Sequence, residues 1–255
     1  SLDMYKAGVR NACILEGCGW PLRDDEMVRR TTRYLQKAFP VDPKGRKVPV
    51  TVPLLKKVLP FLPGWPDMAC MSADDRVFAT ASIMAVSAYL RGGEFLTSKS
   101  STRPVLKNKD VEVVRTSERH ILRIKVPAPK ARKFLKYETA LCFPLVDDDE
   151  FCPYRLRYEY LARVSPELRK PDAPALCRGG KALTRDYMVK RTHALMVKAG
   201  ISFVDKDGVS MDMQASSWRA GAASSAVMAG IPDRDIMAFG RWSSKAWENY
   251  VMSLP

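Results

Sequence analysis

Tyr250 stands close to several groups that could turn its phenol into a nucleophile. It follows the run Gly240-Arg241-Trp242-Ser243-Ser244, and another arginine, Arg219, lies upstream. A phenol has an ordinary pKa of about 10, so it attacks poorly unless cations stabilise both the phenolate and the charge that develops on the substrate. Arginine, lysine and the tryptophan N–H can provide this stabilisation for a phosphate. A single tyrosine near a chain end is nevertheless more often a packing residue.

Arg219 stands in the run Ser216-Ser217-Trp218-Arg219, which predicts the start of a helix capped by serine. The free N–H groups and the positive dipole end of a first helical turn favour an anion, so a cation there is mildly unfavourable for the helix itself. A guanidinium in that position is better explained by binding a phosphate through two parallel hydrogen bonds. The alternative is an ordinary exposed arginine, because charged side chains usually lie at the surface.

Arg91 and Lys130 are two further candidates for contact with an anion. Arg91 lies at the predicted end of a helix, followed by Gly92 and Gly93, and Glu94 could orient its guanidinium. A positive charge also suits a helix C-terminus, which explains Arg91 without any ligand. Lys130 lies in a basic connection between two predicted strands, where a flexible ammonium could reach a phosphate or a leaving group. A surface lysine is the alternative explanation.

These candidates must be positioned by a mainly helical scaffold that carries a small sheet. A helix opened by Ser72 and Asp75 is expected to end at Gly92-Gly93. Val-, Ile-, Leu- and Phe-rich segments predict antiparallel strands at residues 110–115, 120–126 and 138–146. Hydrophobic spacing and helix boundary signals predict further helices at residues 54–62, 153–164, 184–199, 216–229, 233–239 and 243–252. The expected fold class is therefore α+β, mainly α with a small antiparallel β-sheet.

Residues 1–47 are expected to form a separate part of the chain. Helices are predicted at residues 3–17 and 24–38, and the segment from Phe39 to Lys47 combines proline, glycine and charge as linkers do. Two short helices are too few for an independent core, so we interpret them as the end of a larger helical domain. Residues 48–255 are expected to form a single domain.

The charge of the chain indicates a polyanionic partner. Its 42 lysines and arginines exceed its 28 acidic residues, which gives a net charge of +14, and nucleic acid is the usual partner of a large basic domain. No apolar run is long enough for a transmembrane helix, and the N-terminus lacks the apolar core of a signal peptide. The 6 cysteines form no C-x-x-C pair, which argues against a metal site and favours reduced thiols in an intracellular compartment.

The chain resembles the tyrosine recombinase (phage integrase-like) family in the order of its motifs. These motifs are Arg91-x-x-Glu94, a basic hairpin with Lys130, Ser216-x-x-Arg219, Gly240-Arg241-Trp242 and Tyr250. The residues of these motifs are most similar to those in recombinases of eukaryotic mobile elements, such as the crypton-like ones. The resemblance implies that residues 48–255 are a catalytic domain. It also implies that residues 1–47 are the C-terminal part of a helical, DNA-clamping core-binding domain, plus a linker.

The same resemblance implies DNA recombination or integration through a 3′-phosphotyrosyl intermediate. Arg91 and Arg219 would clamp the scissile phosphate, Lys130 would protonate the leaving 5′ oxygen, and Tyr250 would attack. No metal or nucleotide cofactor is implied, because the covalent link stores the energy of the phosphodiester. The implied partners are double-stranded DNA and further copies of the chain, as a dimer to tetramer on DNA. The compartment would be the nucleus in a eukaryote and the cytoplasm for a bacterial or phage protein.

The family's second histidine or tryptophan position falls on Arg241 or Trp242. Spacing from Gly240 favours Arg241, which otherwise has a supporting role, whereas residue type favours Trp242. We favour Trp242, because its indole N–H can donate a hydrogen bond to a phosphate oxygen.

Ser216 departs from the family, which has histidine at this place. A hydroxyl donates hydrogen bonds but is a poor general base near neutral pH, whereas an imidazole titrates there. The loss of a general acid or base typically costs about 10²–10⁴ in rate. Two alternatives therefore stand beside an active recombinase. One is a catalytically weak or silent DNA-binding protein derived from a recombinase, and the other is a type IB topoisomerase-like enzyme.

Overall fold

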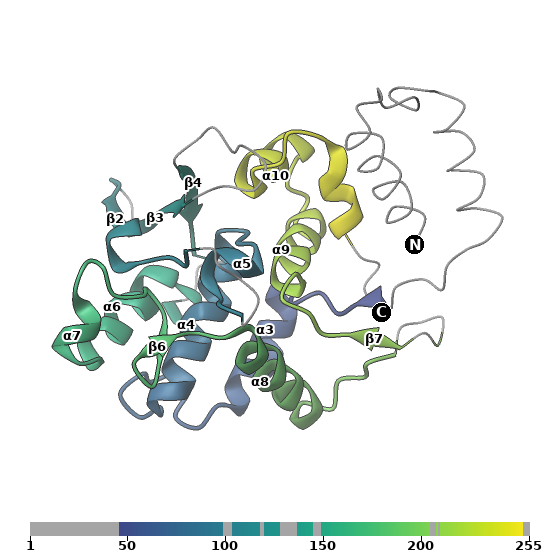
Figure 1. Cartoon of the computed structure of the whole chain (residues 1–255). Helices are drawn as coiled ribbons and strands as arrows, with labels where there is room; N and C mark the ends of the chain where they lie inside the picture. The colour runs from purple at the N-terminus through teal and green to yellow at the C-terminus, as the bar shows by residue number, and fades with distance from the viewer. Residues whose placement is uncertain are drawn as a thin grey trace, which may run out of the picture. The chain divides into compact units, whose positions relative to one another are not determined.

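The computed structural model describes residues 46–98, 104–117, 120–127, 137–144, 149–204, 208 and 210–251 (Figure 1). The helices predicted at residues 3–17 and 24–38 lie outside the described residues, and so does Lys130. The part of the chain that the structure describes contains no helix that is long and apolar enough to cross a membrane.

Helix α4 (Ala73–Ser87) is buried on nearly all sides, and every residue from Val77 to Ser87 is buried. Ser72 caps it as predicted, because the Ser72 hydroxyl accepts a hydrogen bond from the backbone N–H of Asp75 at 3.1 Å. A helix that is apolar around its whole circumference belongs in the core. Accordingly, α4 packs against both α6 (Pro153–Arg163) and α9 (Ser217–Met228).

Helix α9 is the second buried helix, and its small residues let other segments approach closely. A Cβ atom added to Gly221 would lie 1.9 Å from the carbonyl oxygen of Val50, so the backbone at Val50 rests directly on the helix. Two hydrogen bonds hold this contact. The Val50 N–H donates to the Ser217 carbonyl at 2.9 Å, and the Val52 N–H donates to the Ser225 hydroxyl at 2.9 Å.

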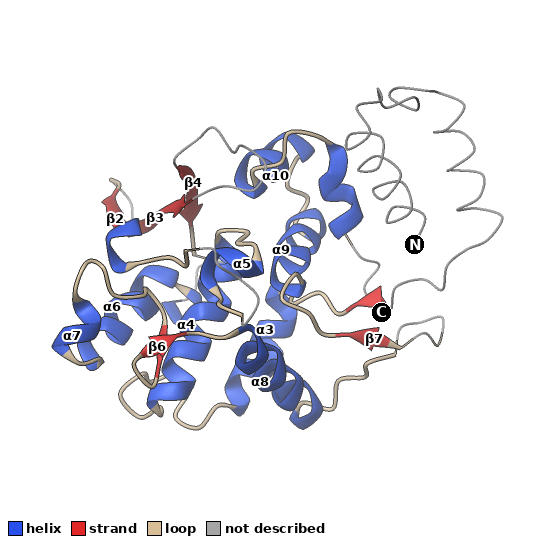
Figure 2. Ribbon diagram, in the orientation of Figure 1, coloured by secondary structure: helices blue, strands red, loops and turns tan. Residues whose placement is uncertain are grey.

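The predicted antiparallel sheet is present, with strand order β2-β3-β4. Its strands are β2 (Val111–Arg115), β3 (His120–Pro127) and β4 (Tyr137–Cys142). Ile124 of β3 lies opposite Val111 of β2 and Ala140 of β4. Leu122, Ile124 and Val126 are buried, so this face of the sheet packs on the helices. Figure 2 shows the sheet beside α10 (Asp233–Gly240), which contacts β4.

The remaining elements are short or flank the buried helices. The helices are α3 (Val52–Val58), α5 (Gly92–Phe95), α7 (Pro166–Arg169) and α8 (Arg185–Lys198), with 3₁₀ turns η1 (Leu59–Phe61), η2 (Asn108–Asp110), η3 (Asp149–Phe151) and η4 (Lys245–Tyr250). The strand pairs are β1 (Arg46–Lys47) with β7 (Met211–Asp212), which is parallel, and β5 (Cys177–Arg178) with β6 (Lys181–Ala182), which is antiparallel. The predicted α+β class is confirmed.

Two local predictions are wrong. The helix expected to end at Gly92-Gly93 ends at Ser87, because the chain bends through Tyr89, whose φ is 50°. Arg91 therefore begins the next helix, at the N-cap of α5, instead of ending the long one. The helix expected at residues 243–252 is the 3₁₀ turn η4.

Candidate active site

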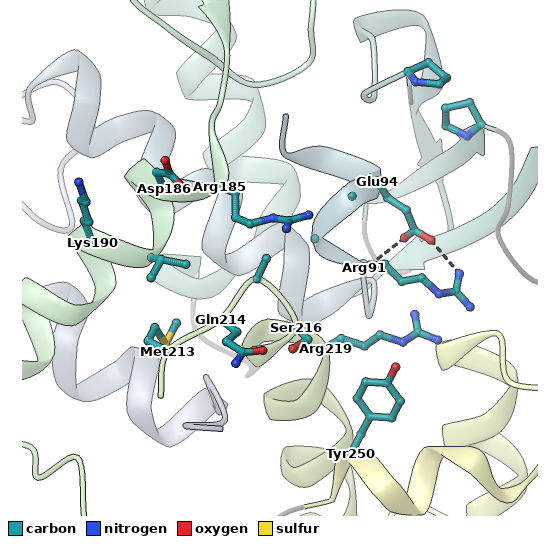
Figure 3. A pocket seen from close by; sticks show the side chains of 16 residues that line it. Arg91, Glu94, Arg185, Asp186, Lys190, Met213, Gln214, Ser216, Arg219 and Tyr250 are labelled. Atoms are coloured by element: carbon teal, nitrogen blue, oxygen red, sulfur yellow. Dashed lines mark hydrogen bonds and ion pairs between the residues drawn. The ribbon is translucent and has the colours of Figure 1, made fainter. Parts of the chain in front are cut away.

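A cleft of about 680 Å³ contains five of the predicted site residues (Figure 3). They are Arg91, Glu94, Ser216, Arg219 and Tyr250. These residues come from α5, from the turn before α9, from α9 itself and from η4, so the cleft joins segments that are distant in sequence. In Figure 3 the guanidinium groups of Arg91 and Arg219 lie side by side, and the Tyr250 hydroxyl points towards them.

Arg91 is held by the carboxylate of Glu94 in two ways. The backbone N–H of Arg91 donates to Glu94 Oε2 at 2.8 Å, and Arg91 Nη1 donates to Glu94 Oε1 at 2.8 Å. The first bond is helix capping, and the second fixes the guanidinium. About a fifth of the Arg91 side chain stays exposed, at 22%, so the guanidinium remains able to meet a ligand from the cleft.

Glycine at position 92 brings Arg91 next to the turn that carries Ser216. A Cβ atom on Gly92 would lie 2.5 Å from the Cβ of Ala215, which is closer than two carbon atoms can approach. Only glycine therefore allows the start of α5 to touch the turn before α9. This contact is one reason why Arg91 and Arg219 share a cleft.

Arg219 is almost wholly buried, with 1% of the residue exposed. Its Nη1 donates to the Tyr89 carbonyl at 2.5 Å, and its Nη2 donates to the Gly240 carbonyl. Burial, followed by repulsion from Arg91 and Arg241, lowers the pKa of Arg219 to about 9. The side chain is still a cation at neutral pH, and an incoming phosphate would stabilise that cation.

Trp242 and Tyr250 lie against the Arg219 guanidinium. The Arg219 Cζ atom is 4.1 Å from the centroid of the Trp242 ring and 5.8 Å from that of Tyr250. The two aromatic rings are 5.5 Å apart between centroids. A Cβ on Gly240 would lie 1.6 Å from the Trp242 ring, so the indole folds back over a glycine that leaves room for it.

Arg241 is also buried, with 6% of its side chain exposed. Its Nη2 donates to Glu94 Oε2 at 2.8 Å, and its Nε lies 3.7 Å from Glu138 Oε2. Burial lowers the pKa of Arg241, and Glu94 acts in the opposite direction. Arg241 lines a separate hollow of about 290 Å³, together with Glu138 and Trp242.

Ser216 lines the cleft but does not cap α9 with its side chain. The residue occupies the N-cap position without a side-chain capping bond, whereas the neighbouring Ser217 hydroxyl accepts from the Gln214 N–H at 3.1 Å. The predicted serine cap is therefore wrong in its side-chain role. The position of Ser216 beside Arg219 is nevertheless what a phosphate-contacting residue needs.

Sequence reasoning missed several residues of the site. Arg185 and Lys190 of α8 line the same cleft, and within the described part of the chain neither has an ion-pair partner. No spacing pattern singles them out, because the chain carries many scattered basic residues. Glu138 and Tyr89 were also missed. A charged residue at the start of an apolar strand was the signal for Glu138, whereas the carbonyl of Tyr89 has no sequence signal.

No protein-family model matches the chain, and no curated protein matches its sequence. Solved structures do match it. XerH site-specific recombinase, bound to a palindromic difH substrate in a post-cleavage complex, is similar with a TM-score of 0.53 at 18% identity. That match covers 82% of this chain and 51% of the XerH chain, so this chain spans about half the length of XerH.

The integrase of the Tn1549 transposon, in complex with a circular intermediate DNA, is similar with a TM-score of 0.52 at 15% identity. That match covers 98% of this chain and 72% of the integrase chain. At such low identity the likeness establishes the fold. The chain has the fold of the tyrosine recombinases, as the resemblance of its motifs predicts.

Proposed function

We propose that this chain is a DNA strand transferase of the recombinase or integrase type, with Tyr250 as its nucleophile. The observation that carries the proposal is the cleft in which two arginines, Arg91 and Arg219, flank a tyrosine. Two guanidinium groups match the non-bridging oxygens of one phosphodiester, and the phenol beside them is a nucleophile that needs no metal. The recombinase fold supports the same conclusion.

In the proposed reaction the Tyr250 oxygen attacks the scissile phosphorus. A bond forms between this oxygen and phosphorus, the bond to the 5′ oxygen breaks, and the phenolic proton passes to solvent. Arg91 and Arg219 stabilise the negative charge that develops on the phosphorane oxygens. Lys130 supplies the proton that the leaving 5′ oxygen takes up. A 5′ hydroxyl from another strand then attacks the phosphotyrosyl bond and reverses these steps.

We propose for Trp242 a role other than a direct phosphate contact. Its ring covers the guanidinium of Arg219 at 4.1 Å, so it limits the directions in which Arg219 can move. Contacts between a guanidinium and an indole face stabilise by about 0.5–2 kcal/mol, more when desolvated. We propose that Trp242 orients Arg219 and contacts Tyr250.

Double-stranded DNA is the proposed substrate. Arg185 and Lys190 extend the positive lining of the cleft beyond the scissile phosphate, so we expect them to bind neighbouring phosphates. Both neighbours of known structure are described as DNA-bound. Exchange of strands between two duplexes requires several cleaving copies, so we propose assembly as a dimer to tetramer on DNA.

One observation favours a second candidate, a silent DNA-binding protein derived from a recombinase. The cleft presents Ser216 where an imidazole would serve as acid or base, and a hydroxyl does not take up protons near neutral pH. This candidate binds DNA through the same cations but forms no covalent link. A type IB topoisomerase-like activity would instead cleave without exchanging partners.

The test uses a library of duplexes that carry a nick and a randomised sequence around it. With a nick close to the cleaved phosphate, the short fragment that carries the released 5′ hydroxyl diffuses away. It then cannot attack the phosphotyrosyl bond, so the covalent adduct accumulates. We expect denaturing gels to show protein–DNA adducts, mass spectrometry to locate the DNA on Tyr250, and Tyr250→Phe to abolish the adduct. DNA binding without any adduct would support the silent protein, and relaxation of an unrelated supercoiled plasmid would support the topoisomerase.

A further inference from the structure

We infer that Arg241 is a positioning residue for Arg91, acting through the carboxylate of Glu94, and that it does not touch the scissile phosphate. The inference rests on the proposed function for its catalytic consequence. The geometry behind it belongs to the free protein and can be tested without DNA.

The carboxylate of Glu94 joins the two arginines. Arg91 Nη1 donates to Glu94 Oε1 at 2.8 Å, and Arg241 Nη2 donates to Glu94 Oε2 at 2.8 Å. Each guanidinium therefore occupies one oxygen of the same group, which fixes the plane of the carboxylate. Because only 9% of the Glu94 side chain is exposed, water can do little to replace a lost partner.

A second buried carboxylate connects the same pair. Glu138 Oε2, from β4, lies 3.9 Å from Arg91 Nη1 and 3.7 Å from Arg241 Nε. Two carboxylates thus contact the same two guanidinium groups. If Arg241 lost its charge, Glu94 and Glu138 would both draw on Arg91. We expect that attraction to pull Arg91 inwards, away from the cleft.

The backbone conformation of Arg241 indicates that specific contacts hold its side chain in this direction. Arg241 ends α10 in the left-handed region, with φ 57° and ψ 42°, where glycine is the usual residue. A non-glycine residue there costs on the order of 1–3 kcal/mol unless its surroundings compensate. The contacts with Glu94, and with the Ala88 carbonyl at 3.3 Å, provide that compensation.

The same turn sends Arg241 and Trp242 in different directions. Trp242 lies over Arg219, whereas Arg241 donates to Glu94; both line the smaller hollow, and neither is among the residues that line the cleft of Tyr250. The turn from Gly240 to Trp242 therefore supports both clamp arginines. Trp242 contacts Arg219 directly, and Arg241 reaches Arg91 through Glu94.

The first test is made on the free protein. In spectra of chain labelled with ¹⁵N-arginine, the exchange of the Arg91 Nη protons reports rotation of its guanidinium. We expect Arg241→Met to slow this rotation by about tenfold, because Glu94 and Glu138 would then both hold the Arg91 guanidinium, which amounts to one more charge-assisted hydrogen bond. Arg234→Met is the matched control, because Arg234 lies on α10 with 89% of its side chain exposed. An Arg91 signal that is identical in Arg241→Met and wild type overturns the inference.

The second test neutralises the opposing charge. In the double variant Arg241→Met with Glu138→Gln, one positive and one negative charge are removed together, so the net charge around Arg91 equals that of the wild type. We expect the rotation of Arg91 to become faster again, towards the wild-type rate. A role confined to folding predicts no such recovery, and its absence counts against the inference. If Arg241→Met does not fold, Arg241→Lys replaces it, and its single ammonium should restore Arg91 only in part.

The third test measures cleavage of a nicked duplex that traps the covalent adduct, under single-turnover conditions. We expect Arg241→Met to slow cleavage by about 10²-fold, as small misplacements of a clamp do, with DNA affinity nearly unchanged. In an Arg91→Lys background, Arg241→Met should cost little more, because the two changes remove one shared function. Full additivity of the two losses would indicate that Arg241 contacts the phosphate itself.

The three tests separate the positioning role of Arg241 from the proposed function. If the wild-type chain traps no DNA from any library member while Arg91 responds to Arg241→Met as expected, the proposed function fails and the positioning role stands. If cleavage occurs while the rotation of Arg91 is the same in Arg241→Met and in the wild type, the positioning role fails and the proposed function stands.

Discussion

The indole ring of Trp242 lies over the guanidinium of Arg219, with 4.1 Å between the ring centroid and the Cζ atom. Tyr250 packs against the same indole, 5.5 Å away between ring centroids, and its ring centroid is also 5.8 Å from the Arg219 Cζ atom. One tryptophan thus links the arginine that would bind the phosphate to the tyrosine that would attack it. Both contacts are made by the indole ring.

Trp242→Phe and Trp242→Leu separate these two uses of the indole. Phenylalanine keeps a ring face for Arg219 but has no N–H, whereas leucine keeps neither. We expect about a tenfold slower cleavage for Trp242→Leu, and a smaller effect for Trp242→Phe, because the cation–ring contact contributes about 0.5–2 kcal/mol. Single-turnover cleavage checks this. Equal losses in the two variants would indicate that the N–H donates to the phosphate.

Ser216→His should restore an acid or base to the cleft. We expect faster cleavage, with a gain that reaches at most about 10²–10⁴. An imidazole accepts a proton only in its neutral form, so the rate should rise as the pH passes upwards through about 6.5. Rates measured from pH 5 to 8.5 test this. Ser216→Asn is the control, because asparagine does not titrate in that range. The same inflection in the pH dependence of its cleavage rate would rule out the imidazole as the cause of the inflection.

Arg219→Met should separate function from stability. Burial lowers the pKa of Arg219 to about 9, which means that the fold holds this cation at a cost. Replacement of a whole buried ion pair by apolar groups of similar size is often neutral or stabilising by about 1–4 kcal/mol, and Arg219 is in addition repelled by Arg91 and Arg241. We expect an unchanged or higher Tm together with loss of the covalent adduct. A strongly lowered Tm would show that the hydrogen bonds to Tyr89 and Gly240 outweigh the cost of burial.

Arg185→Gln and Lys190→Gln should weaken DNA binding without preference for sequence. Each phosphate contact that is lost lowers the slope of log K against log salt by about 1. Binding of a fluorescent duplex between 50 and 200 mM salt, concentrations chosen to span roughly the range where counterion release is measurable, provides the slope. Arg234→Gln, a change at an exposed cation outside the cleft, is the control. Equal slopes for all three variants would contradict the extended cleft.

Gly221→Ala should destabilise the fold through a backbone collision. The new Cβ would meet the Val50 carbonyl oxygen at 1.9 Å, so α9 or the segment at Val50 must shift. Overpacking of this kind costs about 1–3 kcal/mol, occasionally more. Gly93→Ala is the matched control, because no heavy atom lies within 4 Å of a Cβ there. Urea unfolding measures both, and equal midpoints would contradict the close contact between α9 and Val50.

The sequence by itself determined the kinds of element and the residues of the motif. Local sequence patterns predict features that depend on residues close together in the chain. Such features are the Ser72 cap, the three strands and the helix around Arg219. The same reasoning failed at Arg91, because the end of α4 depends on the bend at Tyr89. That bend aims a carbonyl at Arg219, a contact between residues far apart in sequence.

Only the tertiary structure decided how the motif residues face one another. The sequence left Arg241 and Trp242 as alternatives for one position, and the left-handed turn at Arg241 gives them different neighbours. The close approaches at Gly92 and Gly221 bring distant segments together. Such contacts follow from packing across the whole unit, because a cleft is formed by surfaces that no local pattern specifies.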